Sequence, residues 1–324
     1  MGEKLRLSIV VEWENVRLAD SGRAREMLRR VGRQAAELPA DLPSGPVELI
    51  VLHDDELDAV SVGSFVEEAL GPVHPHVELR VVPTPGGGYY ALKNAGARLA
   101  RGDIVVFLDS DVIPEDGWLK NLAPPFASRE VEVVAGSTYT ETTTMYAKAF
   151  ALFWFFPLRP DDGPVVVDRI FFANNVAFRR ETFARYSFPA VDGAARGACY
   201  ALSQTLRKEG IVIYRNPRAR VAHPPPHGLR GFLAKGIAEG RDDLVEACLA
   251  GNSRRTSVRA SLRRFGKQQR NALRQIARHR RRVGLSPAGA AGAAGIATAF
   301  YSLVLFGELM THAAPRAMRR RFQI

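Results

Sequence analysis

Short apolar runs alternate with longer segments of helical periodicity over the first hundred residues of this chain. The runs are rich in Val, Ile and Leu, whereas the intervening segments place apolar residues three or four positions apart. Such alternation predicts strand–helix–strand units, which build a parallel sheet with helices on its faces. The expected strands are 8–11, 47–52, 77–82 and 104–108, and the expected helices are 17–38, 60–70 and 89–100.

The pattern is less regular between residues 131 and 223. The expected strands are 131–135, 171–179 and 211–214, and one helix is expected over 200–208. Three consecutive prolines at 224–226 then end regular structure, because proline fixes φ and has no N–H to donate. We therefore expect residues 1–240 to form one α/β domain.

A basic segment, residues 241–283, follows the expected domain. From residue 254 onward it holds twelve Lys or Arg and no acid. Apolar side chains recur near one helical face among these cations, at Val258, Leu262, Phe265, Leu273 and Ile276. This pattern predicts a basic amphipathic helix, which suits an anionic membrane surface. A solvated or RNA-binding helix is the alternative, but no aromatic platform interleaves the arginines, so we expect no nucleic-acid partner.

The last segment, residues 284–324, is largely apolar over 288–314 and rich in Gly and Ala. Its length would permit a membrane span. Arginine triplets flank it at 280–282 and 319–321, so the positive-inside tendency favours a re-entrant hairpin or interfacial helices over a single crossing. A soluble helical hairpin is the alternative. We expect a peripheral or re-entrant association with the cytoplasmic face of the cell membrane.

The overall charge of +11 is unevenly distributed along the chain. The first 253 residues are mildly acidic, so the basicity belongs to the carboxyl-terminal part. The two cysteines, Cys199 and Cys248, are far apart in sequence, and they predict neither a clustered zinc site nor a disulfide framework. This favours a reducing compartment. Glu12 interrupts the apolar run 7–11, so we expect no secretory signal.

An acidic step, Asp109-Ser110-Asp111, follows directly on the apolar run 104–108. A β-branched run of this length predicts a strand buried on both faces. Carboxylates at the carboxyl end of such a strand point into the crevice where open α/β sheets bind ligands. Hard divalent cations that carry phosphates prefer carboxylate oxygens. The alternative is that these polar residues end the strand and bind no ligand.

Five landmarks in order resemble the family 2 glycosyltransferases, across roughly residues 5 to 240. They are Asn15 after the first strand, Val51-Leu52-His53-Asp54-Asp55, Gly86-Gly87-Gly88 before Lys93-Asn94, Asp109-Ser110-Asp111 before Pro114 and Trp118, and Asn174-Asn175 before Phe178-Arg179-Arg180. The resemblance implies a GT-A type nucleotide-binding sheet flanked by helices, here with a helical carboxyl-terminal extension. It also implies metal-dependent, inverting transfer of a sugar from a nucleotide-diphosphate sugar to a saccharide or lipid-linked acceptor.

The resemblance also implies roles for individual residues. The donor-binding candidates are Glu12, Asn15, Asp54, Asp55, Gly87, Lys93, Asn94, Asp109 and Asp111. The metal, Mn²⁺ or Mg²⁺, is expected on Asp109, Asp111 and His223. The acceptor-side candidates are Trp118, Asn174, Asn175 and Arg196. For Glu12 a surface turn is the alternative, and for His223 a structural role.

The chain departs from the family where the catalytic base is expected. Inverting transfer needs a base to take the proton of the acceptor hydroxyl. The family places a Glu-Asp pair before a helix that corresponds to residues 202–210, whereas this chain has Ala198-Cys199. Asp192 is our candidate base, a Cys199 thiolate is conceivable, and Glu181 is less plausible. A non-catalytic sugar-nucleotide or membrane-binding relative and a nucleotidyltransferase remain alternatives.

Overall fold

The structure is a computed structural model in which two compact units are distinguished. It describes residues 5–17, 21–38, 46–54, 58–71, 76–86, 88–190, 197–249 and 257–321. The first unit, which we call the sheet unit, comprises Met1–Thr138, Pro160–Ala190 and Ala198–His223. The second, the helical unit, comprises Tyr139–Arg159, Val191–Gly197 and Pro224–Ile324.

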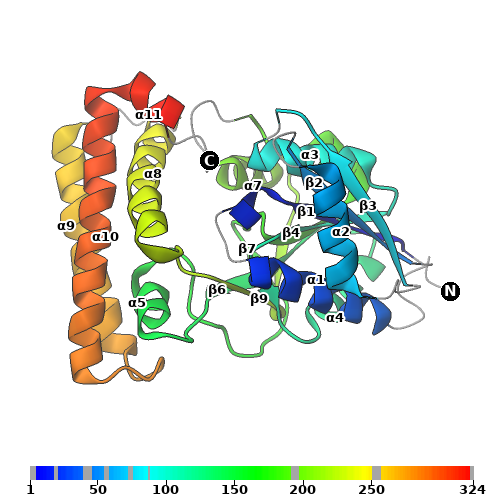
Figure 1. The fold of residues 1–324 in the computed structure, drawn as a ribbon, viewed down its shortest axis with the longest axis horizontal. Coiled ribbons are helices and arrows are strands. Elements are labelled where there is room, and N and C mark those ends of the chain that lie inside the picture. The colour runs from blue at the N-terminus through cyan, green and yellow to red at the C-terminus, as the bar shows by residue number, and fades with distance from the viewer. Residues whose placement is uncertain are drawn as a thin grey trace. The chain divides into compact units, whose positions relative to one another are not determined.

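The described strands of the sheet unit form a nine-stranded mixed sheet (Figure 1). They are β1 (Leu7–Glu12), β2 (Val47–His53), β3 (Val77–Pro83), β4 (Ile104–Asp109), β5 (Ile113–Pro114), β6 (Val133–Thr140), β7 (Val166–Asp168), β8 (Asn175–Arg179) and β9 (Ile213–His223). Their order is β3-β2-β1-β4-β8-β6-β9-β5, and β7 also pairs with β9. The first four strands are parallel to one another, whereas β8 runs antiparallel to β4. The α/β fold predicted from the alternation is confirmed.

Helices cover both faces of this sheet. They are α1 (Ser21–Ala36), α2 (Ala59–Leu70), α3 (Tyr89–Leu99), α4 (Trp118–Leu122), α6 (Arg180–Arg185) and α7 (Ala198–Lys208), with 3₁₀ turns η1 (Glu14–Arg17) and η2 (Pro124–Ala127). Alternate residues of β1, such as Ile9 and Val11, pack with α1, α2 and α4 in one core. On the opposite face α3 lies close to the sheet, because a Cβ at Gly96 would fall 2.4 Å from a Val10 methyl group.

Helices dominate the described residues of the helical unit. They are α5 (Met145–Phe153), α8 (Gly228–Leu249), α9 (Val258–His279), α10 (Pro287–Ala313) and α11 (Pro315–Arg321). Two glycines bring α8 and α10 into backbone contact: a Cβ at Gly240 would meet the Val304 carbonyl oxygen at 1.9 Å, and one at Gly307 would meet that of Ile237 at 2.1 Å. Small residues that let helix backbones approach are typical of apolar helix packing.

Several elements differ from the sequence expectations. The expected helix 17–38 forms α1 over Ser21–Ala36, whereas Arg17 belongs to the preceding turn η1. The expected strand 211–214 overlaps only the start of the eleven-residue β9 (Ile213–His223). β9 extends because it hydrogen-bonds with both β5 and β7, which the sequence pattern did not show. The apolar segment 288–314 forms the continuous helix α10 in place of a hairpin. The expected basic helix is confirmed as α9.

Candidate functional site

Two carboxylates meet at the carboxyl edge of the parallel strands. Glu12 ends β1, Asp109 ends β4, and the two residues are direct partners in the strand register. Glu12 is fully buried and Asp109 is 4% exposed. Buried carboxylates need cations or hydrogen-bond donors beside them, because burial removes the water that would otherwise solvate their charge.

Lys93, on α3, supplies a positive charge to this pair. Its side chain is fully buried, and its Nζ lies 2.7 Å from Asp109 Oδ1. The Tyr89 hydroxyl donates to Asp109, 2.8 Å from Oδ1 and 2.9 Å from Oδ2. Burial raises the pKa of Asp109, and the Lys93 ammonium opposes that rise. Asp109 is therefore held in one position by two side chains of α3.

Glu12 caps the turn η1 that follows β1. Its Oε2 accepts the main-chain N–H groups of Glu14 and Asn15 at 2.9 and 3.2 Å. Its Oε1 is buried and has no hydrogen-bond partner within the described part of the chain. Burial raises the pKa of Glu12 well above its ordinary value; the charge of Asp109 adds to the rise and Lys93 opposes it. A buried oxygen of this kind fits a bound cation or a ligand donor.

Asp111 lies in the loop after β4, and the end of β9 brings His223 beside it. The distance from His223 Nε2 to Asp111 Oδ2 is 3.9 Å. Arg23, on α1, joins the two segments, because its guanidinium donates to the main-chain carbonyl oxygens of Asp111 and Ala222. The side chain of Asp111 is 12% exposed and that of His223 is 15% exposed. Both can therefore be reached by a ligand.

The residues at this edge fit a divalent cation. Because Mg–ligand bonds are about 2.1 Å long, one ion can contact both Asp111 and His223 at their observed separation of 3.9 Å. Among the described residues there is no group of three or more His, Cys, Asp or Glu that could hold a metal by itself. A site of one or two side chains suits Mg²⁺ that is also bound by substrate phosphates. Asp109, the other predicted ligand, already binds Lys93 and Tyr89.

The end of β2 adds two polar residues to the same edge. His53 is fully buried, and its Nδ1 lies 2.7 Å from the Asp54 carbonyl oxygen. Because a carbonyl oxygen only accepts, Nδ1 carries a proton in this contact. The Nε2 of the ring is buried and has no hydrogen-bond partner in the parts of the chain that the structure describes. Asp54 is partly exposed, as a donor contact requires.

The side chain of Asn94, a donor-binding candidate, forms hydrogen bonds with another segment of the protein. Its Nδ2 donates to the Phe188 carbonyl oxygen at 2.8 Å, and its Oδ1 accepts the Phe188 N–H at 3.1 Å. The two bonds hold the segment after α6 against α3. In contrast, Asn15 reaches the carboxylates, because its Nδ2 lies 3.4 Å from Asp109 Oδ2.

The acceptor-side candidates that the structure describes lie in the core. Trp118 is fully buried, and its Nε1–H donates to Asn175 Oδ1 at 2.8 Å. Asn175 in turn donates to the Ala219 carbonyl oxygen at 3.0 Å. Asn174 is 4% exposed and accepts a hydrogen bond from the Thr138 hydroxyl at 2.8 Å. The structure therefore shows these side chains in buried hydrogen bonds that join strands to one another and to α4.

Four predicted residues lie outside the described residues: Asp55, Gly87, Asp192 and Arg196. Of the glycine-rich turn, Gly86 has φ +68°, a left-handed conformation that favours glycine.

Cys199, at the start of α7, faces Tyr90 of α3. Its Sγ lies 3.2 Å from the Tyr90 hydroxyl oxygen. Burial raises the pKa of the Cys199 thiol to about 11, and the Tyr90 hydrogen bond opposes the rise. At neutral pH the group is a thiol, so the thiolate base that the sequence left open is not favoured.

Two contributors to the site were not identified from the sequence. Tyr89 and Arg23 carry no motif of their own, and each acts on a residue distant in sequence, 20 positions away for Tyr89–Asp109 and 88 for Arg23–Asp111. Their roles depend on the packing of α3 and α1 against the sheet. The periodicity of these helices was the only available signal.

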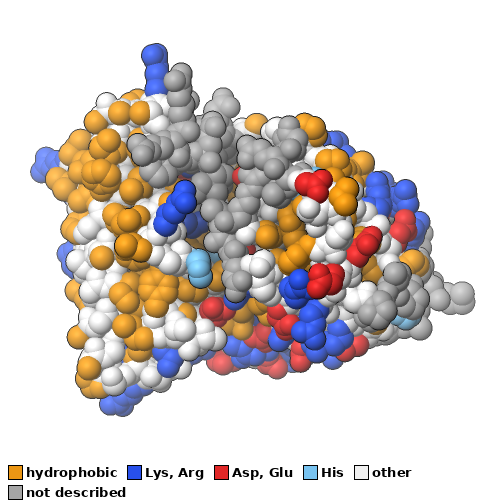
Figure 2. All heavy atoms as spheres, viewed as in Figure 1, with side chains coloured by type: hydrophobic (Ala, Val, Ile, Leu, Met, Phe, Trp, Pro, Cys, Tyr) orange, Lys and Arg blue, Asp and Glu red, His pale blue; other side chains and the backbone are white. Residues whose placement is uncertain are grey.

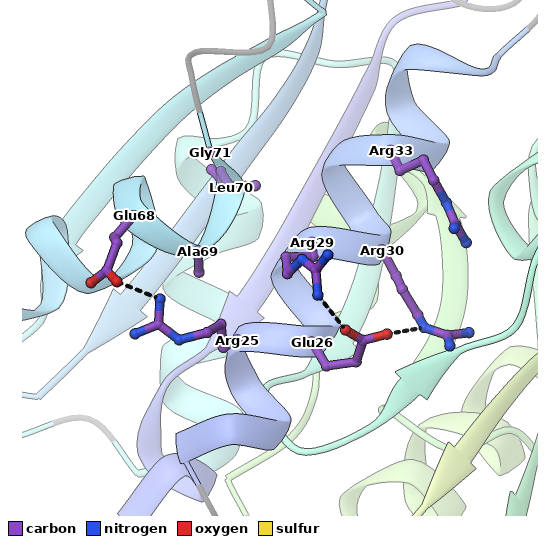
Figure 3. A pocket seen from close by; sticks show the side chains of 9 residues that line it. All are labelled: Arg25, Glu26, Arg29, Arg30, Arg33, Glu68, Ala69, Leu70 and Gly71. Atoms are coloured by element: carbon purple, nitrogen blue, oxygen red, sulfur yellow. Dashed lines mark hydrogen bonds and ion pairs between the residues drawn. The ribbon is translucent and has the colours of Figure 1, made fainter.

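A separate surface groove of about 600 Å³ lies between α1 and the end of α2 (Figure 3). It is lined by several arginines, but these are engaged by glutamates. Arg25 pairs with Glu68 at 2.8 Å, and Arg30 pairs with Glu26 at 2.7 Å. The groove shares no residue with the carboxylate edge, and its arginines are offset by acids, so we do not assign it a ligand.

Comparisons with known proteins identify the family and the fold. The model of the family "Glycosyl transferase family 2" matches residues 23–186, about half of the chain. A search of curated proteins found no match. Among solved structures, the mannosyltransferase PcManGT from Pyrobaculum calidifontis, in complex with GDP-Man and Mn²⁺, is 19% identical with a TM-score of 0.57, covering 97% of this chain and 88% of its own.

Two further structures share the fold. TarS 1–349 of S. aureus, in complex with UDP-GlcNAc, is 13% identical with a TM-score of 0.50, covering 95% of this chain and 92% of its own. GalNAc-T7 with UDP, GalNAc and Mn²⁺ is 15% identical with a TM-score of 0.50, covering 76% of this chain and 52% of its own. At these identities the structures show a common fold alone. With the family match over half its length, the chain belongs to glycosyl transferase family 2 and is a glycosyltransferase of the GT-A fold.

Proposed function

We propose that this glycosyltransferase uses a nucleotide-diphosphate sugar as donor and depends on Mn²⁺ or Mg²⁺. The observation that carries the proposal is the gathering of Glu12, Asp109, Asp111 and His223 at the carboxyl edge of the parallel strands. Ligands of open α/β sheets bind at this edge. The solved structures with GDP-Man and with UDP-GlcNAc support a donor of this class.

Asp111 and His223 would hold the metal, and Glu12 Oε1 lies on the same edge. When bound, the ion supplies Lewis-acid stabilisation of the charge on the leaving diphosphate. Lys93 and Tyr89 fix Asp109 so that its carboxylate can orient the donor. The Mn²⁺ in two of the structural neighbours supports a divalent cation in this role.

The end of β2 would read the nucleotide base. Asp54, which is partly exposed, presents an acceptor carboxylate at this strand end. Both uracil and guanine carry N–H donors on their edges. A carboxylate acceptor therefore fits either base.

The acceptor is a saccharide or a lipid-linked sugar, and transfer proceeds with inversion. Inversion requires a base for the acceptor hydroxyl. The Cys199 thiol does not supply it, because its pKa is raised to about 11. Asp192 remains our candidate, on the basis of its position in the sequence before α7.

The protein acts at the cytoplasmic face of the membrane. α10 is the one described helix that is long and apolar enough to cross a bilayer, with a mean hydropathy of 1.6 over 18 residues. The basic helix α9 precedes it. These two helices support membrane association, and the mildly acidic first 253 residues speak against a nucleic-acid partner.

Isothermal titration with GDP-mannose, UDP-GlcNAc and UDP-GalNAc, each with Mn²⁺ and with EDTA, tests the donor and the metal together. We expect one donor to bind, with the affinity lost in EDTA. The release of the nucleoside diphosphate with candidate acceptors then tests transfer. Absence of binding for a full panel of nucleotide sugars would contradict the proposal.

A non-catalytic sugar-nucleotide-binding protein is the second candidate, favoured by one observation. Ala198 and Cys199 stand where the family has its acidic pair, and the Cys199 group is a thiol. Donor binding without donor hydrolysis or transfer to any acceptor would favour this candidate. Turnover that disappears in Asp192→Asn, while donor affinity is kept, would exclude it.

A further inference from the structure

Six cations form a continuous stripe along α9, which we call the basic stripe. Its members are Arg259, Arg263, Lys267, Arg270, Arg274 and Arg278. Residues spaced by three or four positions lie on the same side of a helix, and these six follow that spacing over the length of α9. All six side chains are exposed. At about 1.5 Å per residue the stripe is roughly 28 Å long.

The charges of the basic stripe are not neutralised within the protein. Across the described residues none of the six makes an ion pair with an acid, whereas their neighbour Arg264 does. Arg264 points to the other side of α9, where its Nε lies 3.0 Å from Glu308 Oε1 of α10. The helix therefore has one cation engaged inward and six presented outward. Like charges in a row repel each other, so the arrangement is stabilised by an external anion.

Exposed apolar side chains lie beside the basic stripe on the same helix. Leu262 is 52% exposed and Leu273 is 48% exposed. Their positions along the helix place both on the flank next to the cations, and Val258 (48% exposed) lies further round. A helix with a cationic stripe and an apolar flank is typical of binding at the interface of an anionic bilayer.

α10, which packs on α9, contributes an uncharged outer side. Its single Asp, Glu, Lys or Arg residue is Glu308, which is 1% exposed and turned toward Arg264. Phe306 and Met310 face outward at 50% and 36% exposure. Only 22% of the most apolar 18-residue stretch of α10 is buried inside the protein. Packing in a protein core therefore does not account for the apolar composition of this helix. Figure 2 shows hydrophobic and uncharged side chains gathered over α10, with Lys and Arg at the margins.

We propose that the basic stripe of α9 and the exposed apolar side chains of α9 and α10 form a docking surface for an anionic phospholipid bilayer. This inference rests on the membrane location proposed above. It specifies which surface of the protein binds the bilayer and that the bound lipids are anionic. The phosphates of the lipid headgroups neutralise the stripe, and Leu262, Leu273 and Phe306 enter the interface. The helices lie on the bilayer, so the contact is peripheral and salt-sensitive.

An RNA partner is the competing reading of the same cations. Single-stranded nucleic acid is held by aromatic side chains that stack on the bases between the cations. The side chains interspersed with the basic stripe are Leu, Ala, Asn and Gln, and the one aromatic residue of α9, Phe265, is half-buried. Aliphatic neighbours of this kind favour lipid.

Vesicle co-sedimentation of the full-length protein, without donor or metal, tests the surface. Vesicles of phosphatidylcholine that contain roughly 30 mol% of the anionic lipid phosphatidylglycerol are compared with vesicles of pure phosphatidylcholine. We expect binding to the anionic vesicles alone, weakened by salt. A cation near the surface contributes about a fivefold factor. The variant Arg263→Gln/Lys267→Gln/Arg270→Gln/Arg274→Gln removes four such cations and should therefore lose about six hundredfold in the partition coefficient.

A charge-matched control removes four exposed cations from the sheet unit: Arg98→Gln, Lys120→Gln, Arg207→Gln and Lys208→Gln. It should keep vesicle binding within about threefold, as should a stripe variant with every Arg replaced by Lys. Leu262→Gln/Leu273→Gln should lose the part of binding that persists in high salt. Equal losses in the stripe variant and the charge-matched control would overturn the proposal, as would equal binding to neutral vesicles. Stripe-dependent binding to an RNA oligonucleotide without vesicle binding would also overturn it.

The outcome is independent of the proposed reaction. Donor affinity, measured by titration, should be the same in the stripe variant and in the parent protein, because the substitutions lie in the helical unit outside the carboxylate edge. Vesicle binding without any donor binding would keep this proposal and contradict the proposed function. Donor binding without vesicle binding would contradict the docking surface and leave the proposed glycosyl transfer standing.

Discussion

His223 Nε2 lies 3.9 Å from Asp111 Oδ2, although 112 residues separate the two in sequence. The contact exists because β9 pairs with β5, which follows the acidic step directly. Arg23 reinforces it by binding a main-chain carbonyl on each side. Asp111 and His223 are more accessible than the buried carboxylates of Glu12 and Asp109 at the same edge.

Asp111→Asn should abolish metal-dependent donor binding, because it removes the carboxylate that is best placed to contact the ion. Titration with the preferred nucleotide sugar and Mn²⁺ measures the effect, and we expect an affinity at least about a hundredfold lower, or roughly 2.7 kcal/mol. Asp116→Asn is the matched control, since the Asp116 side chain is 78% exposed and pairs with Arg30 and Arg33 of α1. An unchanged affinity in Asp111→Asn would remove Asp111 from the site.

Lys93→Met should strongly destabilise the protein, because Asp109 would be left buried without its cation. Breaking a buried pair by removing one partner costs about 3–5 kcal/mol. Urea unfolding gives the free energy of unfolding for the variant. The double variant Lys93→Met/Asp109→Asn should recover part of the loss, since no unpaired charge remains. If both variants were equally unstable, packing by the lysine stem would be the cause instead of the charge.

Glu12→Gln should raise stability at pH 8 more than at pH 5. Burial raises the pKa of Glu12 well above its ordinary value of 4.5, so the folded state binds more protons than the unfolded state above that pH. Folding stability contributed by this group is therefore lost as the pH rises from about 4.5 through the folded pKa. Thermal unfolding in a chelating buffer at both pH values measures the difference. A shift in Tm of the same size at both would contradict a raised pKa.

Asn175→Ala should lower stability and leave donor affinity unchanged. The substitution deprives the Trp118 indole N–H and the Ala219 carbonyl of their partner in a buried place. A buried group left unsatisfied costs about 1–3 kcal/mol. Urea unfolding and donor titration measure the two quantities. The control Asn271→Ala, on the exposed side of α9, should be neutral. Selective loss of acceptor use in Asn175→Ala, without loss of stability, would support the predicted acceptor role.

Gly240→Ala should destabilise the helical unit, because the added Cβ would fall 1.9 Å from the Val304 carbonyl oxygen of α10. Overpacking of this kind costs about 1–3 kcal/mol, which exceeds the helix propensity gained, about 1 kcal/mol. Gly295→Ala in α10 is the control, since its Cβ would meet nothing within 4 Å. Thermal unfolding should therefore show opposite shifts in Tm for the two variants, and equal shifts would argue against close packing of α8 on α10.

The pattern along the chain predicted the parallel half of the sheet well. The runs that became β1, β2, β3 and β4 are buried or half-buried along their length, and an apolar run bounded by polar residues needs no distant information to be recognised. The strands of the second half of the sheet were harder to predict from the sequence. β9 carries Arg215, Arg218 and Arg220, so its apolar pattern is broken, and its length depends on pairing with β5 and β7.

The sequence by itself determined the α/β class, the acidic step after β4, the basic helix α9 and the resemblance to the family. These are local properties, because they depend on residues that are neighbours along the chain. Only the tertiary structure decided what each polar side chain binds: Lys93 and Tyr89 hold Asp109, Asn175 satisfies Trp118 in the core, and His223 joins Asp111. The reason is that hydrogen bonds and ion pairs act over about 3–4 Å, and contacts at that range between distant residues are set by strand register and helix packing.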